Sequence, residues 1–150
     1  MTVAISGKET ADKLEQKFPG SIVESNENSL VIKSEFLLAI AAFLKTTPDL
    51  HFNYLSSITA VDYRRYFEVI YQFVSLGHNH SLVVKARIHE RDNPALPSLV
   101  GLWRGADLQE REIYDLFGIG FEGHPNLKRI VLWEGFPGHP LRKDFKHNGN

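Results

Sequence analysis

The sequence contains no cysteine among its 150 residues. This absence excludes disulfide bonds, thiolate metal sites and cysteine-ligated iron–sulfur clusters within the chain, and it fits a reducing cytosol. Long apolar runs are also missing, because the longest one, Phe36–Leu44, has about half the length that a transmembrane helix needs. The N-terminus has no basic region followed by an apolar stretch, so we expect no secretory signal and only indirect membrane association, through a partner.

Neither positive nor negative charge is in clear excess. The chain has 17 basic and 18 acidic residues and a net charge of −1, which argues against nucleic-acid binding. Neither the nucleophile-elbow pattern G-x-S-x-G nor the phosphate-loop pattern G-x-x-x-x-G-K-[ST] occurs. The sequence therefore gives no support to a serine hydrolase or to an enzyme of the phosphate-loop type.

The apolar spacing predicts an α+β fold in a single domain over residues 1–150, with a mainly antiparallel sheet packed by helices. The predicted helices cover Ser6–Phe18 and Ser34–Lys45, the second apolar nearly all round and therefore covered on more than one side. The predicted strands cover Ser21–Ser25, Ser29–Lys33, Phe52–Leu55 leading to Ile58–Val61, Tyr66–Leu76 and Leu82–Ile88.

Between the last strand and the C-terminal region, Arg91–Pro97 is predicted to be a loop, and Ser98 to cap a short helix over Leu99–Trp103. Tyr66–Leu76 is apolar on both faces, which indicates a central strand. Successive strands joined by short turns pair antiparallel.

A short charged helix follows from Asp107 to Phe117. Asp107 and Glu110 have capping-box spacing, so we expect Asp107 to cap the helix. Arg111 lies four residues from both Asp107 and Asp115 and can bridge the two carboxylates. Gly118 lies where a left-handed C-terminal cap is expected.

From about Gly118 the chain is predicted to be an irregular tail, with Gly-His-Pro at Gly123–Pro125 and again at Gly138–Pro140. Chain so rich in Gly and Pro makes few backbone hydrogen bonds of its own. If the tail is ordered, we expect that either the body of the domain or another protein orders it.

Two chemical interpretations of these residues stay open. Glu110, Glu112 and Asp115 could serve acid–base catalysis or bind a divalent cation, but Glu110 and Glu112 do not share a helix face, which favours a salt-bridge network. The histidine pairs His78/His80 and His124/His139 could bind zinc. The alternative function is therefore a stand-alone metal-dependent hydrolase that uses His124, His139 and Glu110 or Glu112.

The stretch Glu110–Phe121 reads E-R-E-x-x-D-x-x-G-I-x-F. It resembles the hallmark motif of the 30-kilodalton (C subunit) family of respiratory complex I, proton-pumping NADH:quinone oxidoreductase. The resemblance extends over roughly Tyr54–Phe145. The residues that carry it, or that it marks as motif and interface positions, are Glu110, Arg111, Glu112, Asp115, Gly118, Phe121, Gly123, His124, Pro125, Arg129, Trp133, His139, Pro140, Arg142, Lys143 and Asp144.

The resemblance implies a non-catalytic scaffold subunit of the hydrophilic arm, docked on the quinone-side D subunit at the cytoplasmic side of the membrane. It implies no cofactor in this chain, while the whole complex carries iron–sulfur clusters and uses quinone. A related membrane-bound hydrogenase or ferredoxin-dependent complex is the alternative assembly.

The resemblance also implies interface anchors of the aromatic and arginine type. The candidates are Trp133, Trp103, Phe136, Arg129 and Arg142, with a core position as the alternative for Trp103. Many family members have Trp where this chain has Leu108, and many continue well beyond Asp144. We therefore expect the partner contact to depend on the body and the short tail.

Overall fold

The computed structural model describes residues 2–146. The elements, in chain order, are β1 (Val3–Ala4), α1 (Gly7–Lys17), β2 (Ile22–Ser25), β3 (Leu30–Ile32), the 3-10 turn η1 (Ser34–Phe36), α2 (Leu37–Thr46), β4 (Tyr54–Asp62), β5 (Phe67–Ser75), β6 (His80–Ile88), β7 (Ala95–Pro97), α3 (Ala106–Phe117) and β8 (Gly120–Glu122). None of the helices in this described part is long and apolar enough to cross a membrane.

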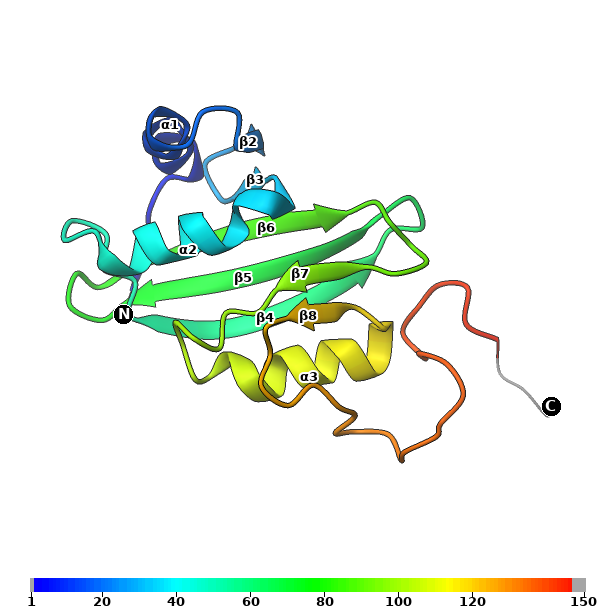
Figure 1. Cartoon of the computed structure of the whole chain (residues 1–150). Helices are drawn as coiled ribbons and strands as arrows, with labels where there is room; N and C mark the ends of the chain where they lie inside the picture. Colours follow the sequence, from blue (N-terminus) through cyan, green and yellow to red (C-terminus); the bar gives the residue numbers. More distant parts are fainter. Residues whose placement is uncertain (1, 147–150) are drawn as a thin grey trace.

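The main sheet has the strand order β2-β3-β6-β5-β4, with β1 also paired to β6 (Figure 1). The meander β4–β5–β6 is antiparallel and β5 lies between two partners, as the apolar pattern predicts. β3 and β1 instead join β6 in parallel. The prediction of a mainly antiparallel α+β fold is confirmed.

A second, two-stranded sheet was not predicted. β7 pairs in parallel with β8, so Ala95–Pro97 is a strand rather than part of a loop. The irregular chain begins after Glu122 rather than at Gly118. Neither strand can be recognised locally, because each has three residues and its partner lies about 25 residues away.

The predicted helix over Leu99–Trp103 is wrong, since this segment forms a single turn. Leu102 N–H and Trp103 N–H both donate to Leu99 O, at 3.0 and 2.9 Å. The Leu99 N–H donates to the Glu110 carboxylate instead of to a local cap, at 2.7 Å. That long-range bond holds Leu99 in a turn, although the sequence after Ser98 is typical of the start of a helix.

The helix α2 lies across one face of the main sheet (Figure 1). Leu37, Ile40, Ala41 and Leu44 are buried, and Phe43 packs edge-on against Phe18 at the end of α1 with ring centroids 5.8 Å apart. Leu38, by contrast, is 47% exposed. Cover on two sides is therefore confirmed, but one stripe of α2 faces solvent.

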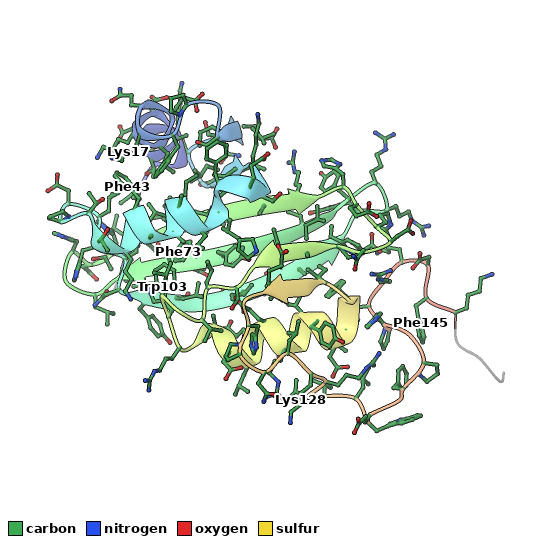
Figure 2. The ribbon with its side chains drawn as sticks, in the orientation of Figure 1. Lys17, Phe43, Phe73, Trp103, Lys128 and Phe145 are labelled. Carbon is green, nitrogen blue, oxygen red and sulfur yellow. The ribbon has the colours of Figure 1, made fainter. Side chains whose placement is uncertain are left out.

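Aromatic side chains form the centre of the core, where Phe73 lies beside Trp103 with ring centroids 5.0 Å apart (Figure 2). Trp103 is 6% exposed, and its indole N–H donates to Phe52 O at 3.2 Å. Of the two positions left open for Trp103, interface or core, the core position is confirmed, because its ring is enclosed and its one donor is satisfied within the core.

Candidate functional site

The residues of the E-R-E motif lie on α3, which packs along the β4 side of the main sheet (Figure 1). The helix begins at Ala106 after Gly105, with no side-chain cap, so Asp107 lies inside the first turn. Glu110 accepts from Ser98 Oγ at 2.6 Å and from Leu99 N–H at 2.7 Å. The predicted capping box is wrong because Glu110 turns into the core and connects α3 to the end of β7.

Glu110 is fully buried, and burial raises the pKa of its carboxyl group, while the donors Leu99 N–H and Ser98 O–H partly offset this effect. Tyr71 is also fully buried and its hydroxyl has no hydrogen-bond partner in the part of the chain described. Burial and the nearby charge of Glu110 raise the pKa of Tyr71. Within residues 2–146 neither group is exposed to solvent.

His124 connects the start of the tail, defined here as residues 123–146, to the first turn of α3. Its Nδ1 accepts from Asn126 N–H at 2.9 Å, so the proton of the neutral ring is on Nε2. Nε2–H then donates to Asp107 O at 3.2 Å and lies 3.0 Å from Asp107 Oδ1. The imidazole thus acts as a structural link with one tautomer favoured.

Asp115 holds the middle of the tail. Its Oδ2 accepts three successive backbone N–H groups, those of Ile130, Val131 and Leu132, at 3.1, 2.7 and 2.8 Å. Its Oδ1 accepts from Arg129 at 3.1 Å. Burial alone would raise the pKa of Asp115, but these donors together lower it below its ordinary value.

Arg111 does not bridge Asp107 and Asp115, so that prediction is wrong. Its guanidinium donates to Lys128 O at 3.1 Å and to Arg129 O at 3.3 Å. Asp115 is unavailable to it because the carboxylate is buried and surrounded by donors from the tail. Arg111 and Asp115 therefore bind the backbone of the tail rather than each other.

The end of the tail satisfies the last carbonyls of α3, which have no partner within the helix. Arg142 Nε donates to Phe117 O at 2.5 Å, His139 Nδ1 donates to Asp115 O at 2.9 Å, and Leu141 N–H donates to Leu116 O at 3.0 Å. Gly118 adopts the predicted left-handed cap with φ 75°. A Cβ at Gly118 would lie 2.7 Å from the His139 ring, so glycine also makes room for the tail.

A second carboxylate, Asp62 at the end of β4, was not predicted as a site residue. It accepts a bidentate pair of hydrogen bonds from Arg91 at 2.7 and 2.8 Å, and the Lys143 N–H of the tail at 2.8 Å. The Arg91 guanidinium holds the pKa of Asp62 far below its ordinary range, against the opposing effect of burial. The only sequence feature that could have indicated this contact is an aspartate at the end of an apolar strand.

The remaining motif residues lie around these contacts. Phe121 is buried in β8, and Gly123 has φ 86°. Pro140 is half-buried, and the exposed positions are Glu112, Pro125, Lys143 and Asp144. Asp144 lies 4.0 Å from Arg91, beside the Asp62 contact.

The tail and the first turn of α3 expose apolar side chains. We call this the tail surface and define it by Ile130 (40% exposed), Val131 (58%), Trp133 (65%) and Leu141 (50%), together with Leu108 of α3 (58%). Trp133 contacts Phe136 edge-on, with centroids 5.6 Å apart. Leu108 points to solvent because, at about 100° per residue, it lies roughly 140° around α3 from the buried Ile113.

Arg129 and Arg142, two of the predicted interface anchors, make their contacts within the chain. Arg129 also donates to Gly138 O at 2.8 Å and lies over the Phe136 ring, 5.8 Å from its centroid. Arg142 lies over the Phe67 ring at 5.1 Å. Both arginines therefore hold the tail in place.

The metal site considered from the histidines has no counterpart in residues 2–146, where no three His, Cys, Asp or Glu side chains gather to hold an ion. His124 and His139 bind different parts of α3. His78 and His80 interact with the carbonyls of Pro48 and Leu50. The metal-dependent hydrolase therefore lacks its predicted ligand set.

Residues 118–123 have the glycine spacing G-x-G-x-x-G. In dinucleotide-binding proteins this pattern joins a strand to the start of a helix. Here it follows α3 and forms β8, so the order of elements is reversed. The pattern has no phosphate-binding geometry in this fold.

Comparisons with known proteins agree with the resemblance. Residues 30–150 match the family described as respiratory-chain NADH dehydrogenase, 30 Kd subunit. The NADH-quinone oxidoreductase C subunit of Roseiflexus sp. (strain RS-1) is 39% identical over 149 residues, covering 95% of this chain and 85% of that protein. The Moorella thermoacetica protein of the same name is 41% identical over 138 residues, covering 89% and 91%.

A solved structure, that of the membrane-bound sulfane sulfur reductase, an archaeal respiratory membrane complex, contains a chain with the same fold. The TM-score is 0.74 at 24% identity, over 93% of this chain and 85% of that one. The family match and the NADH-quinone oxidoreductase relatives together show that this chain belongs to the 30-kilodalton (C subunit) family of the respiratory-chain NADH dehydrogenase.

Proposed function

We propose that this chain is a non-catalytic scaffold subunit in the hydrophilic arm of a proton-pumping NADH:quinone oxidoreductase, where it docks on the quinone-side D subunit. It lies peripherally at the cytoplasmic side of the membrane, and other subunits carry the iron–sulfur clusters and the quinone site. The observation that carries the proposal is that Arg111 and Asp115 of the motif hold a tail that exposes apolar residues.

The arrangement suits an interface better than a reaction site. Asp115, Arg129 and Arg142 bind groups of this chain, so they have little freedom to bind a substrate. The tail surface, by contrast, exposes an indole and several aliphatic side chains next to basic and acidic ones. An aromatic anchor surrounded by polar residues is typical of protein–protein contacts.

The test is co-purification of the complex from the native host in mild detergent, with Trp133→Glu compared with Leu76→Glu. Both wild-type side chains are 65% exposed, but Leu76 lies in the β5–β6 turn, away from the tail. We expect Trp133→Glu to lose the quinone-side subunit and Leu76→Glu to retain it. Equal recovery of that subunit with both variants would contradict the proposal.

The wild-type preparation also identifies the assembly. Co-purifying NADH-oxidising and quinone-site subunits support the proposed complex, whereas hydrogenase or ferredoxin-oxidising subunits would identify a related complex with the same docking role. If the chain purified alone, the scaffold role would be rejected.

A further inference from the structure

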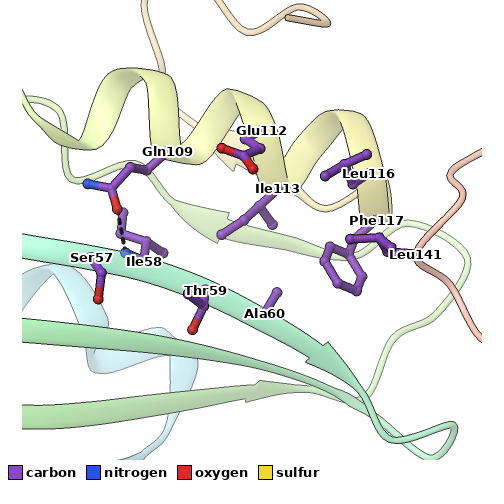
Figure 3. A pocket seen from close by; sticks show the side chains of 10 residues that line it. All are labelled: Ser57, Ile58, Thr59, Ala60, Gln109, Glu112, Ile113, Leu116, Phe117 and Leu141. Carbon is purple, nitrogen blue, oxygen red and sulfur yellow. Dashed lines mark hydrogen bonds between the residues drawn. The ribbon is translucent and has the colours of Figure 1, made fainter. Parts of the chain in front are cut away.

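A groove runs between the outer edge of the main sheet and α3. β4 is the last strand of the sheet path, so one side of its backbone has no strand partner in the described structure. Ile58 N–H on that side donates to Gln109 Oε1 of α3 at 2.7 Å (Figure 3). Because outward backbone groups alternate along an antiparallel strand, those of Ala60 face the same way.

The groove has a volume of about 350 Å³ and mixed chemistry. Ile113, Leu116 and Phe117 form its apolar wall, and Leu141 of the tail closes one end (Figure 3). Glu112 lies at the mouth, is exposed, and has no ion pair among residues 2–146. The groove thus combines an apolar wall, strand backbone without a partner and an unpaired carboxylate.

We propose that this groove receives a short extended segment of the partner protein on the quinone side. The segment bonds the outward backbone of Ala60, inserts one apolar side chain against Ile113 and Leu116, and places a lysine or arginine beside Glu112. This inference rests on the proposed function, because Leu141 belongs both to the groove and to the tail surface.

The backbone of β4 selects an extended segment over a helix. A helix satisfies its own N–H and C=O groups, whereas an extended chain offers them to the edge of a sheet. Gln109 already occupies the Ile58 N–H, so the new contact is limited to the part of the edge around Ala60. The charge of Glu112 favours a basic residue in the segment, since an exposed like charge would be repelled.

The direct test is Ala60→Pro in the full chain, measured as affinity for the isolated quinone-side subunit. Proline removes only the outward N–H of an edge strand and keeps the ladder to β5, so the melting temperature should stay close to that of the wild type. We expect binding to weaken about tenfold or more. Unchanged affinity of a folded variant would overturn the inference.

A second pair of variants tests the charge. Glu112→Lys should weaken binding several-fold, whereas Asp12→Lys, which makes the same charge change on the exposed side of α1, should not. Equal effects of the two would contradict the assignment of a basic residue to the segment.

Hydrogen exchange in the wild-type chain keeps the inference testable if Ala60→Pro does not fold. The Ala60 amide should exchange fast in the free chain and slowly in the complex, and fast exchange in both would overturn the inference. If the wild-type chain shows no binding to the quinone-side subunit, the proposed function fails. If it binds and Ala60 is unaffected, only the groove is rejected.

Discussion

The body (residues 2–122) and the tail (residues 123–146) are stabilised by different forces. The body buries a core of large side chains, among them Phe52, Phe67, Tyr71 and Phe73, each with no exposed surface. Within residues 123–146 no residue is buried as a whole, although the side chain of His124 is enclosed. The tail is instead held by a few side chains of the body and the tail that bond backbone across their boundary, chiefly Asp62, Asp115, Arg111 and Arg142.

This difference predicts how the body unfolds and how the tail is released. Apolar burial is shared among many residues and unfolds cooperatively. The tail depends on a few charge-assisted bonds, each worth more than a neutral hydrogen bond. We therefore expect substitutions that release the tail and leave the body folded, but none that do the reverse.

The largest effect is expected from Phe73→Ala, which removes the ring that packs on Trp103, Phe52 and Tyr71. The free energy of unfolding should fall by about 3–5 kcal/mol, and the tail should lose its order in the same transition. Urea denaturation measures the loss. Val23→Ala, at a half-exposed position on β2, should change stability by less than about 0.5 kcal/mol.

Asp115→Asn should release the tail while the body stays folded. The variant loses the charge that accepts three N–H groups and the Arg129 guanidinium, at an expected cost of about 1.5–3 kcal/mol in tail docking. Limited proteolysis should cut near residues 128–135 much faster than in the wild type. Glu112→Gln, an exposed carboxylate on the same helix, should leave the cleavage rate unchanged, and equal rates in both variants would refute the role of Asp115.

Gly118→Ala should destabilise the junction by about 1–3 kcal/mol, because alanine is strained at φ 75° and its Cβ would meet the His139 ring. Gly123→Ala is the matched control, with φ 86° and no atom within 4 Å of the added Cβ. Thermal melting of both variants separates backbone strain from the clash. A drop in melting temperature as large for Gly123→Ala would show that the tail contact adds nothing.

A change of pH within the neutral range is expected to have the smallest effect on the docking of the tail. The pKa values of Asp62 and Asp115 are lowered in the folded chain, so their stabilisation is complete above the unfolded pKa of about 3.9 and is lost as the pH falls through the lowered values. The tail should stay docked near neutral pH and detach only in strong acid. Amide NMR signals of residues 130–132 report this, and detachment near pH 6 would contradict it.

The body could be predicted from the sequence because its signals are local. The apolar pattern of Tyr66–Leu76 predicts a central strand, which is β5, and the helix predicted over Ser6–Phe18 corresponds to α1. The pairing of β7 with β8 could not be predicted, because each segment has three residues and becomes a strand only by pairing with the other.

The identity of the site residues could be predicted from the sequence, but their hydrogen-bond partners could not. The motif marked Glu110, Arg111 and Asp115, yet helical spacing suggested that they bind one another. In the structure each binds a segment distant in sequence, because burial and backbone donors select partners that i, i+4 spacing does not show. Asp62 was missed for the same reason, as its tail partner Lys143 lies 81 residues away.

The central claim is that the body alone orders the tail and so preforms the tail surface. Amide hydrogen exchange of the isolated wild-type chain at neutral pH tests it most directly, at Ile130, Val131 and Leu132. The account predicts slow exchange at all three, because each N–H donates to Asp115 Oδ2 within 3.1 Å. Exchange at the rate of an unstructured peptide would contradict it and would show that the tail folds only on its partner.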